Sequence, residues 1–180
     1  GGDSVFGIAT RLAGPDEDAV AAYAERILEL NLGREMAGGE RFTNPGLIDV
    51  GCSAGLNLNV DRVGITYSNG QSLGDPSSAV QLPASIVGDR PVPARAMPEV
   101  VARIGVDLDP VDVTDADDAR WLRACLWPDQ PERAARLEAE MALAATAPPL
   151  LLHGDAVEVM PGAFARVPAD ALPVVITTWA

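Results

Sequence analysis

The residues best suited to chemistry lie in one short stretch, Leu-Ile-Asp-Val-Gly-Cys-Ser-Ala-Gly-Leu-Asn, at positions 47–57. Its apolar start predicts a buried strand, and Gly51 and Gly55 predict a tight turn that leads into a helix. A turn of this kind directs backbone N–H groups and a helix N-terminus toward one point, which favours polar or anionic ligand groups. Asp49 would lie at the carboxyl end of the strand, where open α/β sheets bind their ligands.

The spacing of the residues in this turn distinguishes between the known glycine motifs, each of which binds a different class of ligand. A dinucleotide-binding G-x-G-x-x-G pattern fails twice, because Ser53 and Leu56 stand where glycines are required. A phosphate-binding P-loop needs a lysine, and all basic residues of this chain are arginines. The third pattern, acidic-x-G-x-G-x-G, fits Asp49, Gly51 and Gly55, with Ser53 in place of the middle glycine. It is the first motif of S-adenosylmethionine-dependent methyltransferases, and a glycine turn that binds no ligand is the alternative.

The composition restricts which binding partners and which cellular location are expected. With 180 residues, 48% apolar and 22% charged, the chain has the make-up of one soluble globular domain. Its formal net charge of −13 disfavours nucleic acid and anionic membrane surfaces and leaves a small molecule as the expected partner. Neither a transmembrane run nor a signal peptide is visible. Cys52 and Cys125 have no metal or disulfide spacing, so a cytoplasmic location is expected.

The elements that must position the turn alternate between strands and helices. Helices are expected over 115–127 and 131–145, with a brief helical piece that starts at Asp155 and ends at Pro161-Gly162. The pattern predicts an α/β fold with one parallel, Rossmann-like sheet and right-handed crossovers. Its four buried strands are expected at 47–51, 104–108, 150–153 and 174–178.

Three further segments complete the predicted layout. Residues 1–44 are expected to form a helical segment, and residues 45–180 the α/β domain. Residues 63–92 are expected to be a β insertion, because Asn69-Gly70 is a strong hairpin signal. Residues 98–103 are predicted to begin with a helical turn.

Acidic residues follow each of the next two predicted strands. Asp107 or Asp109 ends the second strand, where nucleoside-binding sheets place the acid that binds ribose hydroxyls. The separation from Asp49 is 107 − 49 = 58 residues, against about 20 in the usual unit, and the β insertion accounts for the excess. Asp155 and Ala156 follow the third strand, the position at which methyltransferases hold the adenine.

Several of these segments occur in the order typical of one known family. They are Asp49 to Leu58, Gly74-Asp75-Pro76, Gly105 to Val113, Arg120-Trp121-Leu122, Trp127 to Gln130 and Gly154-Asp155-Ala156. Over about residues 45–180 the chain resembles the bacterial family called domain of unknown function 2332. That family is similar to class I S-adenosylmethionine-dependent methyltransferases.

The resemblance implies that S-adenosylmethionine is the cofactor and a small molecule the methyl acceptor. No residue stands out as a catalytic base, and many methyltransferases need none, because positioning supplies much of the rate. Members of the family have longer chains, so the sheet is expected to be truncated after its fourth strand. The apolar edge at 174–176 would then be exposed or pair with a second copy. The implied cofactor-binding residues are Asp49, Gly51, Ser53, Gly55, Asn57, Asp107, Asp109, Asp155 and Ala156.

Three other functions compete with methyl transfer. Positions 51–55 also fit G-x-S-x-G, which would make Ser53 the nucleophile of a hydrolase and His153 its base. Asp107-x-Asp109 resembles the motif of haloacid-dehalogenase-like phosphatases, in which two carboxylates hold magnesium. A non-catalytic binding or scaffolding module is the third, because a fold does not imply a function.

Overall fold

The computed structural model of the chain describes residues 44–88, 92 and 96–177. The predicted N-terminal helical segment therefore lies outside the described residues, apart from its last position. No helix in the described part of the chain is both long enough and apolar enough to cross a lipid bilayer.

Four parallel strands form the main sheet: β1 (Pro45–Val50), β5 (Ala102–Asp107), β6 (Leu150–His153) and β7 (Leu172–Thr177). Their order across the sheet is β6-β5-β1-β7, and every neighbouring pair is parallel. The prediction of one parallel sheet is confirmed, and each strand lies within two residues of its predicted bounds. The chain first builds outward from β1 through β5 and β6, and then returns to the other side of β1 for β7.

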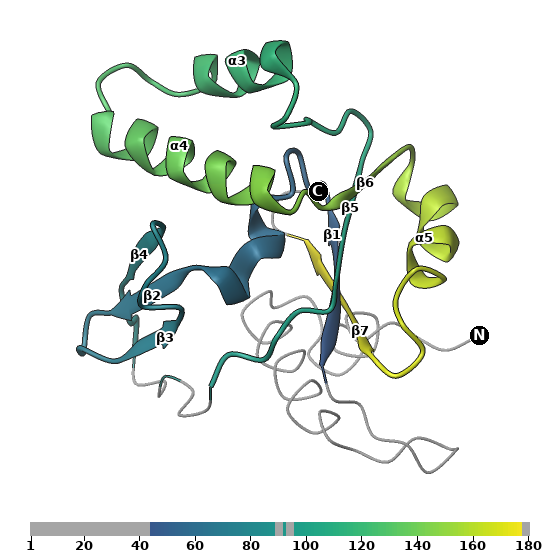
Figure 1. Ribbon diagram of the computed structural model, residues 1–180, viewed down its shortest axis with the longest axis horizontal. Helices are drawn as coiled ribbons and strands as arrows, with labels where there is room; N and C mark the ends of the chain where they lie inside the picture. Colours follow the sequence, from purple (N-terminus) through teal and green to yellow (C-terminus); the bar gives the residue numbers. More distant parts are fainter. Residues whose placement is uncertain (1–43, 89–91, 93–95, 178–180) are drawn as a thin grey trace.

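The side chains of β1 alternate between two separate apolar cores. Leu47 packs with Leu58 and Val174 on the face covered by the 3-10 helix η1 (Leu56–Arg62). Ile48 packs with Ile104, Val106 and Ala163 on the opposite face, which α5 (Ala156–Phe164) covers. Figure 1 shows α5 on one side of the sheet and η1 on the other. Both faces of the strand are thus buried, which explains its nearly continuous apolar sequence.

Two further helices lie on the η1 side of the sheet, α3 (Ala116–Ala124) and α4 (Pro131–Thr146). Asp115 begins α3 as its N-cap, because its carboxylate accepts from the backbone N–H groups of Asp117 and Asp118. Pro131 begins α4 in the first helical position, where its missing N–H costs nothing. Both predicted helices are present, although α3 ends at Ala124, three residues before its predicted end. Helix α4 passes over η1 (Figure 1).

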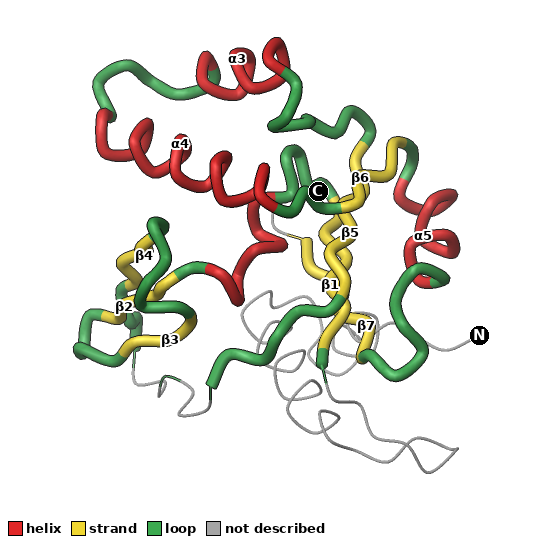
Figure 2. Tube along the Cα trace, viewed as in Figure 1, coloured by secondary structure: helices red, strands yellow, loops and turns green. Residues whose placement is uncertain are grey.

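A small second sheet stands apart from the main one, as Figure 2 shows. Its hairpin joins β2 (Gly64–Tyr67) to β3 (Ser72–Gly74) through a turn at Gly70, whose φ of 85° requires the freedom of glycine. The third strand, β4 (Gln81–Ala84), pairs with β2 in parallel. The predicted β insertion is confirmed, whereas the parallel pairing had no sequence signal.

Two local predictions were wrong. The helical turn expected at 98–103 is extended, because the Val100 N–H donates to the Asp61 carboxylate (2.9 Å) and the Val101 N–H to the Pro45 carbonyl (3.0 Å). The end of α5 expected at Pro161 lies instead at Phe164. Ala163, fully buried against the sheet, gains enough from packing to carry the helix past the proline.

Strand β7 is an edge of the described sheet, because β1 is its sole partner there. The side chain of Val174 is nevertheless buried, with 7% of its surface exposed. The other two apolar residues of the predicted edge, Val175 and Ile176, are partly exposed. Pairing with a second copy through this edge stays a prediction.

Candidate functional site

The carboxyl ends of β1, β5 and β6 meet at one edge of the main sheet. In the register of the sheet, Asp49 is opposite Gly105, and Asp107 is opposite His153. Asp49 and Asp107 therefore lie on adjacent strands at the same edge, as predicted. Asp155 follows β6 two residues after His153. Three strand ends with acidic residues are thus brought together, and we call this arrangement the acidic edge.

The turn after β1 has three residues with left-handed backbone. The φ angles are 74° at Gly51, 49° at Ser53 and 65° at Gly55. Gly55 is also tightly enclosed, since an added Cβ would lie 3.0 Å from Cγ of Pro149. Ser53 is the one described non-glycine residue with positive φ, a conformation that stores strain in most side-chain-bearing residues. The turn is therefore held in its shape by its surroundings.

Hydrogen bonds within the protein already engage most amides of the turn. The Gly51 and Cys52 N–H groups donate to the Val106 carbonyl at 2.9 and 3.3 Å, and the Gly55 N–H donates to the Cys52 carbonyl at 2.8 Å. The Ser53 N–H donates to Oδ2 of Asp107 at 2.7 Å. Of the five N–H groups that the turn was expected to direct toward a ligand, one, that of Ala54, donates to no other described residue.

Asp107 links the turn to the end of β5. Its Oδ2 accepts from Ser53, and its Oδ1 accepts from the Asp109 N–H at 3.0 Å. The Val111 N–H donates back to the Ser53 carbonyl at 3.0 Å. Asp107 is partly exposed and Asp109 exposed. Each carboxylate oxygen of Asp107 therefore keeps acceptor capacity for a ligand hydroxyl.

Asp49 is fully buried and poorly satisfied. Its Oδ2 accepts one long hydrogen bond, 3.4 Å from Nδ2 of Asn57, and its Oδ1 has no partner. Burial raises the pKa of Asp49, the bond from Asn57 lowers it, and the nearby charge of Asp107 raises it further. A buried carboxylate with an unpaired oxygen is stabilised by any cation or hydrogen-bond donor that reaches it. Asn57, which is exposed, covers it.

The cysteine of the turn is a neutral packing group. Burial raises the pKa of the Cys52 thiol to about 12, and the charges of Asp107 and Asp49 add to the shift. A thiol in this state is not a nucleophile at neutral pH. Its sulfur occupies the space that Gly105 leaves open on β5.

Replacing Gly105 with alanine is expected to lower the free energy of unfolding by about 1–3 kcal/mol, the usual cost of overpacking. The new Cβ would lie 2.5 Å from Sγ of Cys52 and 2.8 Å from Cδ2 of Leu151. Chemical denaturation checks the value, with Gly162→Ala in α5 as the control, which should be neutral or stabilising because alanine is favoured over glycine inside a helix. Adding Cys52→Ala should recover part of the loss, and an additive double variant would contradict the proposed clash.

The remaining predicted site residues have local structural roles. Asp155 is exposed and caps α5, with its carboxylate 2.8 Å from the Val157 N–H. Ala156 packs against the core on the α5 side. Ser53 and His153 are both exposed, and no hydrogen bond joins these two described residues. No group of three or more metal-binding side chains occurs within the described ranges, so Asp107 and Asp109 have no further ligand there.

The described surface includes three cavities that sequence reasoning did not predict. The first, of about 360 Å³, lies beside the turn and is lined by Ala54, Val111, Asp112, Val113, Thr114, Pro148, Pro149 and Leu151. The second, of about 120 Å³, lies between η1, β4 and α4 and is lined by Leu56, Asn57, Asn59, Val60, Val63, Leu82 and Glu140. We call it the η1–α4 cavity. In the sequence Glu140 is one of several acidic residues on an amphipathic helix. Its place in the lining of a cavity is seen only in the tertiary structure.

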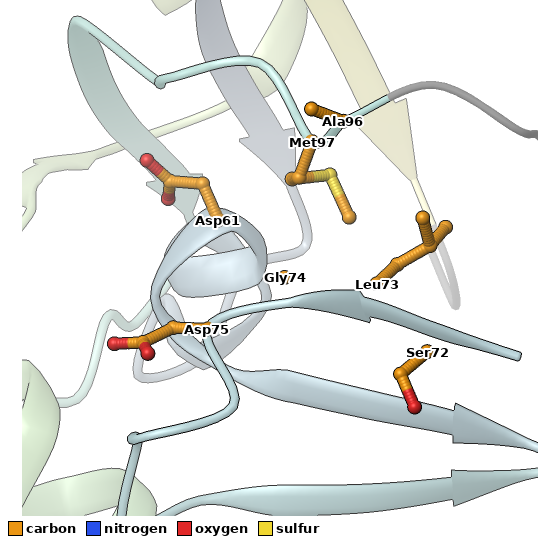
Figure 3. A pocket seen from close by; sticks show the side chains of 7 residues that line it. All are labelled: Asp61, Ser72, Leu73, Gly74, Asp75, Ala96 and Met97. Carbon is orange, nitrogen blue, oxygen red and sulfur yellow. The ribbon is translucent and has the colours of Figure 1, made fainter.

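The third cavity, of about 380 Å³, lies between the end of η1, β3 and residues 96–97. Figure 3 shows Met97 and Leu73 on one side of it and the carboxylates of Asp61 and Asp75 on the other. None of its lining residues belongs to the acidic edge. Asp61 is already engaged by Arg103. Oδ1 of Asp75 accepts from the N–H and the hydroxyl of Ser77, whereas its Oδ2 accepts from no described residue.

A family model described as "Uncharacterized protein conserved in bacteria (DUF2332)" matches residues 38–180, which is most of the chain. No curated protein and no solved structure matches the chain.

Proposed function

The chain belongs to this family of uncharacterized bacterial proteins, and we propose that its acidic edge binds S-adenosylmethionine and that the protein transfers the methyl group to a small molecule. In this proposal the methionine end of the ligand lies near Asp49 and the Gly51 turn. The ribose lies against Asp107 and Asp109. When bound, S-adenosylmethionine supplies an electrophilic methyl group, and the protein supplies binding and orientation.

The observation that carries the proposal is the unsatisfied carboxylate of Asp49. One of its oxygens has no partner although the residue is fully buried. The α-ammonium group of a methionine moiety is a cation that could complement it, directly or through a water. Among the described residues, the exposed amide of Asn57 donates the one hydrogen bond to this carboxylate, so a ligand that reaches Asp49 would meet Asn57.

The topology of the sheet supports a nucleoside ligand. Numbered among themselves, the main-sheet strands have the order 3-2-1-4, which is also the order in the first part of doubly wound nucleotide-binding sheets. In those sheets the acid after the second strand binds ribose hydroxyls. Asp107 occupies that position at the end of β5 and keeps acceptor capacity on both oxygens.

The charge of the site favours a cationic cofactor over a phosphate-bearing one. Asp49, Asp107, Asp109 and Asp155 lie at the acidic edge, and no described arginine donates to any of them. The pyrophosphate of a dinucleotide would meet these carboxylates and a turn whose amides are mostly engaged. S-adenosylmethionine has no phosphate and is positively charged at sulfur.

The adenine is best accommodated in the cavity beside Ala54. This cavity has apolar walls from Val111 and Leu151, and its volume of about 360 Å³ is within the usual range of ligand pockets. We place the adenine there rather than against Asp155 and Ala156, because Asp155 caps α5 and Ala156 packs into the core on the α5 side.

A ligand panel on the full chain tests this proposal by thermal denaturation. S-adenosylmethionine and S-adenosylhomocysteine are expected to raise the Tm, since a ligand at 100 times its Kd adds about 2.7 kcal/mol to the stability. NADH and ADP are expected to leave the Tm unchanged because of their phosphates. An equal or larger shift with ADP would contradict the proposal, and no shift with any ligand would favour a scaffolding role.

A further inference from the structure

The η1–α4 cavity has a chemical character of its own. Leu56, Val60 and Leu82 give it apolar walls, and Glu140 is its one acidic group. Two amides complete the lining, those of Asn57 and Asn59. Its volume of about 120 Å³ is well below the range of about 300–1,000 Å³ of ordinary ligand pockets. A short alkyl chain with one polar group fits this space, whereas a nucleoside does not.

The carboxylate of Glu140 is compensated in part by the charge of Arg136, one helical turn earlier on α4. It is partly buried, and no described residue donates a hydrogen bond to it. Burial raises the pKa of Glu140, and the charge of Arg136 lowers it. A carboxylate that is partly removed from water and lacks a donor favours a cationic ligand group beside it.

The cavity adjoins the acidic edge through one side chain. Asn57 lines the cavity and also donates to Asp49, so it separates the two carboxylates. Asn59 is 2% exposed, and its Oδ1 accepts from Nη1 of Arg62 at 3.5 Å. A second ligand in this cavity would therefore lie next to the site of the first.

We propose that the η1–α4 cavity binds the ammonium group of a small alkylamine, with Glu140 as the anionic partner and the apolar walls around the alkyl chain. The identification of this amine as the methyl acceptor rests on the proposed function, whereas the binding itself does not. In that step the ammonium would first lose a proton, to Glu140 or to water. The free amine nitrogen would then bond to the methyl carbon as the carbon–sulfur bond breaks, and S-adenosylhomocysteine would leave. The same geometry rejects a carboxylic acid, because its charge would oppose that of Glu140.

A titration of the full chain with propylammonium chloride tests the inference. The readout is the chemical shift of the side-chain amide signals of nitrogen-15-labelled asparagines in NMR spectra. The signals of Asn57 and Asn59 are expected to shift in a saturable way. Propanol, which has the same chain length and no charge, is expected to cause little shift. Equal shifts with both probes would overturn the assignment of an ammonium site.

Variants on α4 make the test specific. Glu140→Gln removes the charge without changing the shape, and the loss of a charge-assisted contact should weaken propylammonium binding about tenfold or more. Glu132→Gln is the matched control, because Glu132 is exposed on the same helix and does not line the cavity, and it should bind as the parent does. Undiminished binding in Glu140→Gln would refute the inference.

Calorimetry with S-adenosylhomocysteine separates this inference from the proposed function. If S-adenosylhomocysteine binds and propylammonium does not, the amine site is refuted and the proposed function stands. If propylammonium binds in a Glu140-dependent way and S-adenosylhomocysteine does not, the cavity is an amine site in a protein with a different function.

Discussion

Replacing Asp61 with alanine is expected to lower the free energy of unfolding by about 3–5 kcal/mol, the range found when one partner of a buried ion pair is removed. Both oxygens of Asp61 lie 2.6 Å from Nη2 of Arg103, and Oδ2 also accepts from the Val100 N–H at 2.9 Å. The side chains are 9% and 13% exposed, so water replaces little of what is lost. Arg103 would be left buried, and its Nε already has no partner.

This pair matters because it joins the end of η1 to the start of β5 across 42 residues. Urea denaturation of Asp61→Ala checks the value. Asp117→Ala removes the exposed pair with Arg120 and serves as the control, which should cost less than about 1 kcal/mol. A loss in Asp61→Ala no larger than that in the control would show that this connection is dispensable.

Replacing Asp49 with asparagine is expected to weaken the binding of S-adenosylhomocysteine by about tenfold to a hundredfold, because an ionised partner is lost. The same change should leave the stability at neutral pH unchanged or raise it. The folded-state pKa of Asp49 is raised above the ordinary 3.8, so its buried charge destabilises the fold above that raised pKa. This penalty disappears as the pH falls through the folded-state pKa toward 3.8.

The free energies of unfolding of the parent and of Asp49→Asn should therefore approach each other as the pH is lowered in that range. Denaturation at several pH values, with Asp109→Asn as an exposed control, measures the difference. Binding that is lost together with stability would indicate that Asp49 is a structural residue and not a ligand contact.

The strands of the main sheet were predictable because turn residues bracket them. Pro148 and Pro149 precede β6 and Gly154 follows it, and the predicted bounds of that strand equal the observed ones. The extended segment before β5 was not predictable, because its conformation depends on Asp61, 39 residues earlier. Local propensity cannot register such a contact.

The positions of the acidic residues at the strand ends were predictable from the sequence, but their hydrogen bonds were not. The sequence pattern places Asp49 and Asp107 at one edge, and the structure confirms this. It does not reveal that Asp107 accepts from the Ser53 N–H, which engages one of the amides of the turn. The partnerless Oδ1 of Asp49 and the partly buried Glu140 likewise arise only from tertiary packing.

Isothermal titration calorimetry with S-adenosylhomocysteine on the full chain tests the central claim most directly. Saturable one-to-one binding is predicted for the parent protein and for Ser53→Ala, because the Ser53 hydroxyl has no part in the proposed site. Binding should vanish in Asp107→Ala, which removes the ribose acceptor and the link to the turn. The absence of heat with the parent at millimolar ligand, or equal binding by Asp107→Ala, would contradict the account.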